Sequence, residues 1–195
     1  KGFHAKMGTT PPPSMLQVPG YFKGSPHTAI GHDAEVPWPG YIQRMDYELE
    51  LGYVVGKRGS NLRPEHARAY LFGLTIFNDW SGRDRQSLEM PILMGPTKSK
   101  DFAYGIGPWI TTIDEFDDLD AIPMTVRVNG ETFASGNSGN KLWTVDELIA
   151  RKPPTLLTPG AAEAIAVKAY RMIRTESLSP SAALAARERP ATQST

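Results

Sequence analysis

Two glutamates separated by one residue, Glu48 and Glu50, are the first candidates for chemistry in this chain. Apolar and acidic residues alternate across residues 45–55, which predicts a strand whose acidic face carries Asp46, Glu48 and Glu50. Residues two apart on a strand lie roughly 6.5 to 7 Å from each other, so both glutamate carboxylates could bind one hard cation. A solvated strand face shows the same alternation, and the spacing alone leaves both interpretations open.

A second polar cluster lies in the sequence FNDWSGRDRQ, residues 77–86, where a hydrophobic strand is predicted to end. Strand ends commonly carry functional residues, which makes Asp79 a candidate third carboxylate. Three hard oxygen donors suit Mg2+, Mn2+ or Ca2+ and disfavour Zn2+, for which histidine or cysteine ligands are expected. The alternative is that Asn78 and Asp79 form a helix cap or a turn.

A third segment, KSKDFAYGIGPWI at residues 98–110, contains two lysines before an extended stretch. Either Lys98 or Lys100 could contact a substrate oxygen through its ammonium group. Lysines are abundant on protein surfaces, so taken alone both are more simply interpreted as solvated side chains.

Together, the three segments closely resemble the signature series of the fumarylacetoacetate hydrolase family. The motifs are ELE at residues 48–50, NDWSGRDRQ at residues 78–86 and KDFAYGIGPW at residues 100–109. The resemblance covers about residues 21–160 and includes VPWP at residues 36–39, NGE at residues 129–131 and LLTPG at residues 156–160. It implies an α+β, mainly β domain, a mixed β-roll with few short helices, that forms a homodimer.

The resemblance also implies roles for individual residues. In the family, Mg2+ or Mn2+ is held by two glutamates and an aspartate, an arginine and a glutamine contact the substrate, and a lysine adds positive charge. By motif position the metal ligands are Glu48, Glu50 and Asp79, the substrate contacts are Arg83 and Gln86, and the lysine is Lys100 instead of Lys98. The family's early histidine, a general base toward water, falls on His4, and Met7 stands where many members have a glutamate that orients it.

The implied activity is that of a divalent-metal-dependent hydrolase or lyase. Its substrate would be a 2-oxo acid or a 1,3-dicarbonyl compound, similar to an acylpyruvate or to fumarylacetoacetate, in aromatic or amino-acid catabolism. The cation stabilises the enolate that forms when a C–C bond breaks. Because stabilisation of an enolate by a cation also serves decarboxylation and isomerisation, those reactions are alternatives. Another alternative is a homologue that binds metal and 2-oxo acid without turnover.

The elements that position these residues are predicted from turn formers and periodicity. The first 40 residues contain many prolines and glycines, which predicts loop with short extended pieces. A helix is predicted to begin at Pro64, run through Leu71 and end at Gly73. A strand over residues 74–78 is predicted to follow at once.

The second half of the chain contains further strand signals. Asn129 and Gly130 join two β-type runs, residues 124–128 and 131–135, and form the strongest short hairpin signal there is. The other predicted elements are a loop at residues 91–100, a strand at residues 106–113, an acidic turn at residues 114–120 and a short helix at residues 145–151. Few helices among many strands favour a mixed, mainly β domain.

Composition limits the partners of the chain. With 195 residues, of which 40% are hydrophobic, one domain with one core is expected. Because 21 basic residues balance 21 acidic ones, neither nucleic acid nor an anionic membrane surface is favoured as a partner. The absence of cysteine excludes a disulfide framework, and no apolar run approaches the roughly 20 residues that cross a bilayer. We therefore expect a cytoplasmic enzyme with a small-molecule substrate.

Because the first residue is Lys1 and not Met, one interpretation is that the chain is a fragment of a longer protein.

The sequence changes character at Gly160, which divides a predicted catalytic domain, residues 1–160, from an atypical end, residues 161–195. In the family a strand and a Gly-Thr-rich loop that closes over the ligand follow this position, whereas here the sequence is AAEAIAVKAYRMIR. Its alanine content predicts a peripheral helix to about residue 174 and then a disordered tail. A different interpretation is an interaction protein whose tail forms an amphipathic partner helix, with Ile165, Val167 and Tyr170 on one face.

Overall fold

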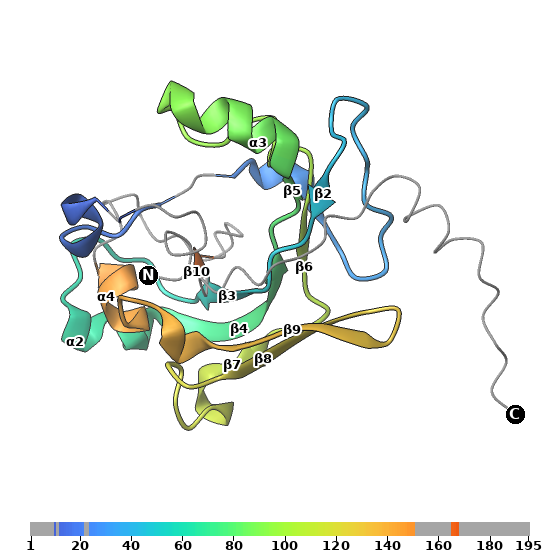
Figure 1. Cartoon of the computed structure of the whole chain (residues 1–195). Coiled ribbons are helices and arrows are strands. Elements are labelled where there is room, and N and C mark those ends of the chain that lie inside the picture. The colour runs from blue at the N-terminus through green and yellow to red at the C-terminus, as the bar shows by residue number, and fades with distance from the viewer. Residues whose placement is uncertain (1–9, 11, 22–23, 151–164, 168–195) are drawn as a thin grey trace, which may run out of the picture.

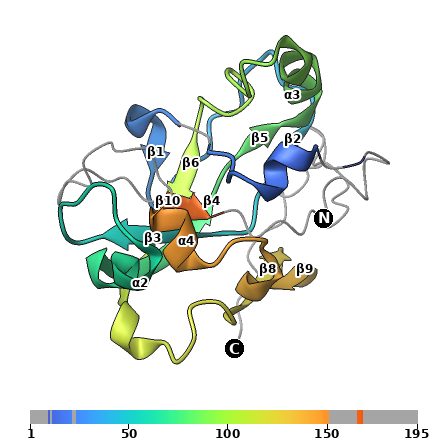
Figure 2. The same cartoon turned by 90° about the vertical axis from the view of Figure 1, so that its left-hand side faces the viewer.

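The computed structural model describes residues 10, 12–21, 24–150 and 165–167. His4 and most of residues 161–195 therefore lie outside the described residues. Figures 1 and 2 show the arrangement of the elements from two perpendicular directions.

Within the described residues, six strands form the central sheet. They are β1 Ala29–Ile30, β3 Glu50–Val55, β4 Leu71–Asn78, β6 Tyr104–Ile106, β7 Thr111–Thr112 and β10 Ile165–Val167. Their order is β1-β6-β4-β3-β10, with β7 also paired to β4, and all pairs are antiparallel except β1 with β6. The long pair β3–β4 runs through the middle of the molecule (Figure 1).

Smaller elements surround this sheet. β2 Met45–Asp46 pairs with β5 Ser81–Gly82, and β8 Pro123–Val128 pairs with β9 Glu131–Asn137. The helices α2 Pro64–Ala67 and α4 Val145–Ala150 lie at one end of β3–β4, whereas α3 Arg83–Glu89 lies near β2 and β5 (Figures 1 and 2). The 3-10 helices are η1 Pro13–Leu16, η2 Pro26–Thr28, η3 Arg68–Tyr70, η4 Met90–Ile92, η5 Ile113–Glu115 and η6 Ser138–Asn140. Of the helices in the described ranges, none has the length and apolar content needed to span a membrane.

The hydrophobic core lies where α2 and α4 meet the β3–β4 pair. Its large members are at most 8% exposed and include Tyr53, Val55, Leu71, Leu74 and Val145. Burial of each such side chain contributes about 1.5 to 3 kcal/mol to stability. The end of the strand pair at Val55 and Leu71 is therefore stabilised by apolar burial.

Several predictions from sequence are confirmed. The fold is α+β, a mixed sheet with few short helices. The hairpin β8–β9 turns at Asn129 and Gly130, whose φ angles of 51° and 84° are the left-handed values that an Asn-Gly turn accommodates. The short helix predicted at residues 145–151 is α4.

The strand predicted at residues 45–55 is divided into β2 and β3. β2 pairs with β5 and β3 pairs with β4, so the chain passes from one sheet to the other at residues 47–49. There the backbone N–H of Glu48 donates to Asn78 Oδ1 at 2.9 Å and not to a strand partner. Alternation of residue types cannot reveal a change of partner strand, which is why the sequence predicted one continuous strand.

The helix predicted to end at Gly73 is shorter than expected. α2 ends at Ala67, η3 extends to Tyr70, and β4 already begins at Leu71. A Cβ atom at Gly73 would collide with the carbonyl oxygen of Thr111 in β7. Gly73 therefore permits close approach of two strands and is not a helix stop.

The strand predicted at residues 106–113 is interrupted. β6 ends at Ile106 and β7 begins at Thr111, with a cis peptide bond between Gly107 and Pro108 in the gap. Proline has no N–H group to donate to a strand ladder, so pairing stops before it.

Residues 165–167 also differ from the helix predicted for that segment, because they form β10 along β3. The edge of β3 that faces away from β4 presents N–H and C=O groups that need partners, and β-branched residues such as Ile165 and Val167 suit a strand. The amphipathic helix face predicted from Ile165, Val167 and Tyr170 therefore does not form at the first two positions. The rest of that prediction lies outside the described residues.

Candidate metal centre

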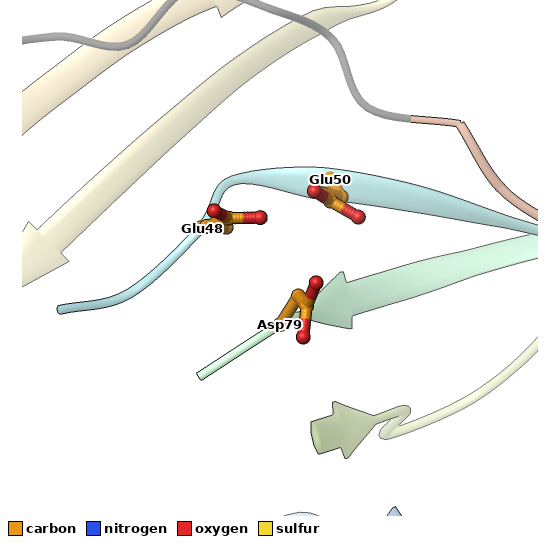
Figure 3. Close-up of side chains that lie close together, drawn as sticks. All are labelled: Glu48, Glu50 and Asp79. Atoms are coloured by element: carbon orange, nitrogen blue, oxygen red, sulfur yellow. The ribbon is translucent and has the colours of Figure 1, made fainter. Parts of the chain in front are cut away.

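Three carboxylates meet at the polar end of the β3–β4 pair. Glu50 is the first residue of β3, Glu48 lies two residues earlier in the connection from β2, and Asp79 follows the last residue of β4. Because Glu50 pairs with Phe77 across the antiparallel ladder, the start of β3 lies beside the end of β4. One oxygen atom from each carboxylate lies within 4.8 Å of the others, and the three side chains face one another (Figure 3).

These carboxylates lie in a site that is mostly withdrawn from solvent. Glu50 is 2% exposed and Asp79 is 4% exposed. Carboxylates this close and this buried repel one another and lose hydration, so they require nearby cations to remain charged. Two basic side chains supply part of this compensation.

Lys100 is the first of these cations. Its Nζ lies 2.6 Å from Asp79 Oδ2 and 3.1 Å from Glu48 Oε1, and it donates to Ser81 Oγ at 2.7 Å. The Lys100 side chain is 1% exposed, whereas Lys98 is exposed and its Nζ lies 6.0 Å from the centre of the Tyr41 ring. The structure therefore brings Lys100, and not Lys98, to the carboxylates.

Arg83, the first residue of α3, is the second cation. Its Nε lies 2.7 Å from Asp46 Oδ2, and its Nη1 lies 2.9 Å from both Glu48 Oε1 and Gln86 Oε1. Burial opposes the charge of the guanidinium, but the carboxylates of Glu48 and Asp46 outweigh burial and raise the Arg83 pKa above its ordinary value. Arg83 and Gln86 thus lie at the site, where Arg83 links a metal-ligand candidate to a helix.

The charge of this cluster suits one divalent cation. Four carboxylates, of Asp46, Glu48, Glu50 and Asp79, accompany the two cations Arg83 and Lys100, so formal charges of −4 and +2 leave −2. One Mg2+ or Mn2+ would balance that remainder, and all three candidate ligands offer the hard oxygen atoms that these ions prefer. The donor set and the charge therefore fit the divalent cation expected from the resemblance.

Sequence reasoning missed three residues that hold this arrangement. Asp46 was placed on the same acidic face as the glutamates, but it pairs with Arg83 and does not join the three carboxylates. Ser81 is fully buried, and its single hydroxyl proton can be donated either to the backbone oxygen of Asp79, at 3.0 Å, or to Glu48 Oε1, at 3.3 Å. Asn78 accepts from the Glu48 backbone through its side chain. Asn78 and Ser81 lie inside the NDWSGRDRQ motif, which was the available signal for them, whereas Asp46 lies two residues before the ELE motif.

The remaining predicted residue, His4, lies outside the described residues, so its role stays a prediction.

Comparison with known proteins adds independent findings. A family model described as fumarylacetoacetate (FAA) hydrolase C-terminal matches residues 3–160. Oxaloacetate tautomerase YisK of Bacillus subtilis (strain 168) is 33% identical over 132 residues, which are 67% of this chain and 43% of that protein. The mitochondrial oxaloacetate tautomerase FAHD2A of Homo sapiens is 32% identical over 149 residues, 75% of this chain and 46% of that protein.

The fold has solved counterparts as well. The fumarylacetoacetate hydrolase from psychrophilic Exiguobacterium antarcticum matches with a TM-score of 0.64 and 30% sequence identity, covering 76% of this chain and 53% of that chain. The chain thus spans about half the length of the proteins that it resembles.

Proposed function

The chain belongs to the fumarylacetoacetate hydrolase family, and from this premise we propose that it is a divalent-metal-dependent enzyme that acts on a 2-oxo acid or a 1,3-dicarbonyl compound. The proposed reaction is C–C bond cleavage in which negative charge develops on a carbonyl oxygen of the substrate. The cation, when bound, acts as a Lewis acid that stabilises this charge.

One observation carries the proposal. Glu48, Glu50 and Asp79 converge within 4.8 Å where the start of β3 lies beside the end of β4. A purely structural role does not explain three buried carboxylates that converge, because each additional like charge destabilises the fold. That the chain contains such a destabilising cluster therefore favours a functional role for it.

The neighbouring residues support distinct roles in such a reaction. Lys100 holds its ammonium at the edge of the carboxylate cluster, where it would stabilise negative charge that develops on a substrate oxygen. Arg83 keeps Glu48 in one orientation while it is itself held by Asp46 and Gln86. Contact of Arg83 and Gln86 with substrate remains part of the proposal, as do His4 as the base toward water and homodimer formation.

A second candidate reaction is tautomerisation of a 2-oxo acid such as oxaloacetate. It is favoured by the two relatives that are named oxaloacetate tautomerases. Keto–enol exchange moves a proton between carbon and oxygen and needs no attacking water, so it does not depend on His4 in the role of a base toward water.

Calorimetric titration of the metal-stripped chain with Mn2+, with and without oxalate, tests the proposal. Oxalate presents two adjacent oxygen atoms as a 2-oxo acid does. We expect one Mn2+ per chain, tighter binding of Mn2+ when oxalate is present, and loss of both in Asp79→Asn. Asp117→Asn is the matched control, because Asp117 is an exposed carboxylate away from the site.

Turnover assays then separate the candidate reactions. Loss of absorbance of an acylpyruvate with release of pyruvate would identify C–C cleavage, whereas accelerated keto–enol exchange of oxaloacetate would identify tautomerisation. Binding of Mn2+ and oxalate without either reaction would identify a homologue that binds without turnover. Absence of Mn2+ binding to the wild-type chain would contradict the proposal.

A further inference from the structure

Glu89, the last residue of α3, is a buried carboxylate that takes no part in the cluster of three. It is 3% exposed. Its Oε2 accepts from the backbone N–H groups of Thr97 and Ser99, at 2.8 and 3.2 Å, and from Ser99 Oγ at 2.7 Å. Its Oε1 accepts from Arg85 Nε at 3.0 Å, one helical turn earlier. Both carboxylate oxygens are therefore engaged, and three of the four hydrogen bonds go to one short segment.

That segment, residues 97–99, leads directly into Lys100. The backbone N–H of Lys100 donates to Thr97 O at 2.9 Å, which makes the segment a closed turn. Ser99 O in turn accepts from the backbone N–H of Gly82 in β5 at 2.8 Å. The turn is thus fastened on one side to the site and on the other to Glu89.

The lysine side chain needs such support. It is a flexible four-carbon chain, and the point at which its ammonium is held depends on the backbone from which it starts. The ammonium lies against Asp79 Oδ2 and Glu48 Oε1, oxygen atoms of two of the three candidate metal ligands. Residues that fix the position of Lys100 therefore also affect how strongly a metal cation can compete with the ammonium for these carboxylates.

We propose that Glu89 is a positioning residue that holds the turn 97–99 and thereby fixes the Lys100 ammonium against the carboxylate cluster, which tunes the affinity of that cluster for a divalent cation. The inference rests on the proposed metal site but does not depend on the identity of the substrate. It assigns a function to a residue that lies outside the three motifs that mark the site.

A double-mutant cycle measures this coupling. Mn2+ affinity is determined by calorimetry for the wild type, Glu89→Gln, Lys100→Met and the double variant. Lys100→Met removes a positive charge next to the ligands, so Mn2+ is expected to bind about tenfold more tightly. Glu89→Gln provides only one acceptor oxygen and no charge, so the turn loosens, Lys100 competes less well, and Mn2+ affinity is expected to rise about threefold. In the Lys100→Met background the same change is expected to have no effect.

Three further variants test the hydrogen bond to Glu89 or serve as controls. Ser99→Ala removes one hydrogen bond to Glu89 while keeping its charge, and is expected to shift the affinity in the same direction by less; it also serves if Glu89→Gln folds poorly. Lys57→Met, at an exposed lysine outside the turn, is the matched control for Lys100→Met, and Glu115→Gln, at an exposed glutamate, is the control for Glu89→Gln. Neither control is expected to change Mn2+ affinity.

Two results would overturn the inference while leaving the metal site intact. One is an effect of Glu89→Gln that is the same with and without the Lys100 ammonium, since a general loosening of the fold would act in both backgrounds. The other is no change of Mn2+ affinity in Glu89→Gln or in Lys100→Met. Failure of the wild type to bind Mn2+ is a different outcome, which contradicts the proposed function and the positioning role together.

Discussion

The two ends of the β3–β4 pair are built from opposite chemistry. At one end Val55 pairs with Leu71, and both belong to the hydrophobic core beneath α2 and α4. At the other end Glu50 pairs with Phe77, and Asp79 follows, beside Lys100. Burial stabilises the first end, whereas burial of charged groups at the second end opposes folding. A site of this kind can persist because the apolar end of the same strands holds them together.

The comparison predicts that a change at the polar end abolishes binding without unfolding the protein. Glu48→Gln removes the charge of a candidate ligand that also pairs with Arg83 and Lys100. We expect Mn2+ affinity to fall about 100-fold or more, and turnover with it, because loss of support for metal ligands alone costs 10- to 100-fold. Calorimetry measures the affinity, and a thermal melt checks that the variant is folded. Retained Mn2+ binding would exclude Glu48 as a ligand.

A change at the apolar end should lower stability without changing Mn2+ affinity. Leu74→Ala deletes buried apolar volume at a residue that is 2% exposed, so we expect the free energy of unfolding to fall by about 2 to 5 kcal/mol. Mn2+ affinity of the folded fraction should not change. Urea denaturation gives the free energy, with Leu142→Ala, at a side chain that is 55% exposed, as the control. A similar loss in both variants would show that burial at Leu74 is not the cause.

The polar end should also make stability depend on pH through Glu89. Burial opposes the charge of this carboxylate, but hydrogen bonds from Ser99 and Thr97 outweigh burial and lower its pKa from 4.5 to about 2. A group whose pKa is lower in the folded state stabilises the fold above its unfolded pKa and loses that contribution as the pH falls through the folded value. We expect a loss of roughly 2 to 3 kcal/mol between about pH 5 and pH 2.

Urea denaturation at several pH values measures this loss. In Glu89→Gln, which carries no titrating group at this position, the decline of unfolding free energy below about pH 5 should be smaller by that amount. An identical decline in the wild type and the variant would show that Glu89 is not the source.

The smallest effect is expected from the ion pair at the apolar end. Arg68 Nη2 lies 3.0 Å from Asp146 Oδ2 and joins η3 to α4, but the two side chains are 46% and 27% exposed. Exposed pairs of this kind contribute about 0 to 1 kcal/mol, so Asp146→Asn should lower the unfolding free energy by no more than that. The contribution of this ion pair to the unfolding free energy should decrease further in high salt. A loss comparable to that of Leu74→Ala would show that charge, too, stabilises this end.

Local signals in the sequence were sufficient for several features. The Asn129–Gly130 hairpin was predictable because its backbone angles are imposed by the two residues themselves. The acidic pair Glu48 and Glu50 and the strand before Asp79 were visible as patterns only a few residues long. The division of residues 45–55 into two strands was not, because it depends on which other strand each part contacts.

By itself the sequence determined the family, the fold class, the hairpin and the three carboxylates that mark the site, since each depends on residue type and short spacing. The resemblance already selected Lys100 over Lys98. The tertiary structure alone decided that Asp46 pairs with Arg83, that the Lys100 ammonium contacts Asp79, and that Glu89 holds the turn before Lys100. The physical reason is distance along the chain. Asp46 and Arg83 are 37 residues apart and Asp79 and Lys100 are 21 residues apart, and only the pairing of strands brings such residues within hydrogen-bond distance.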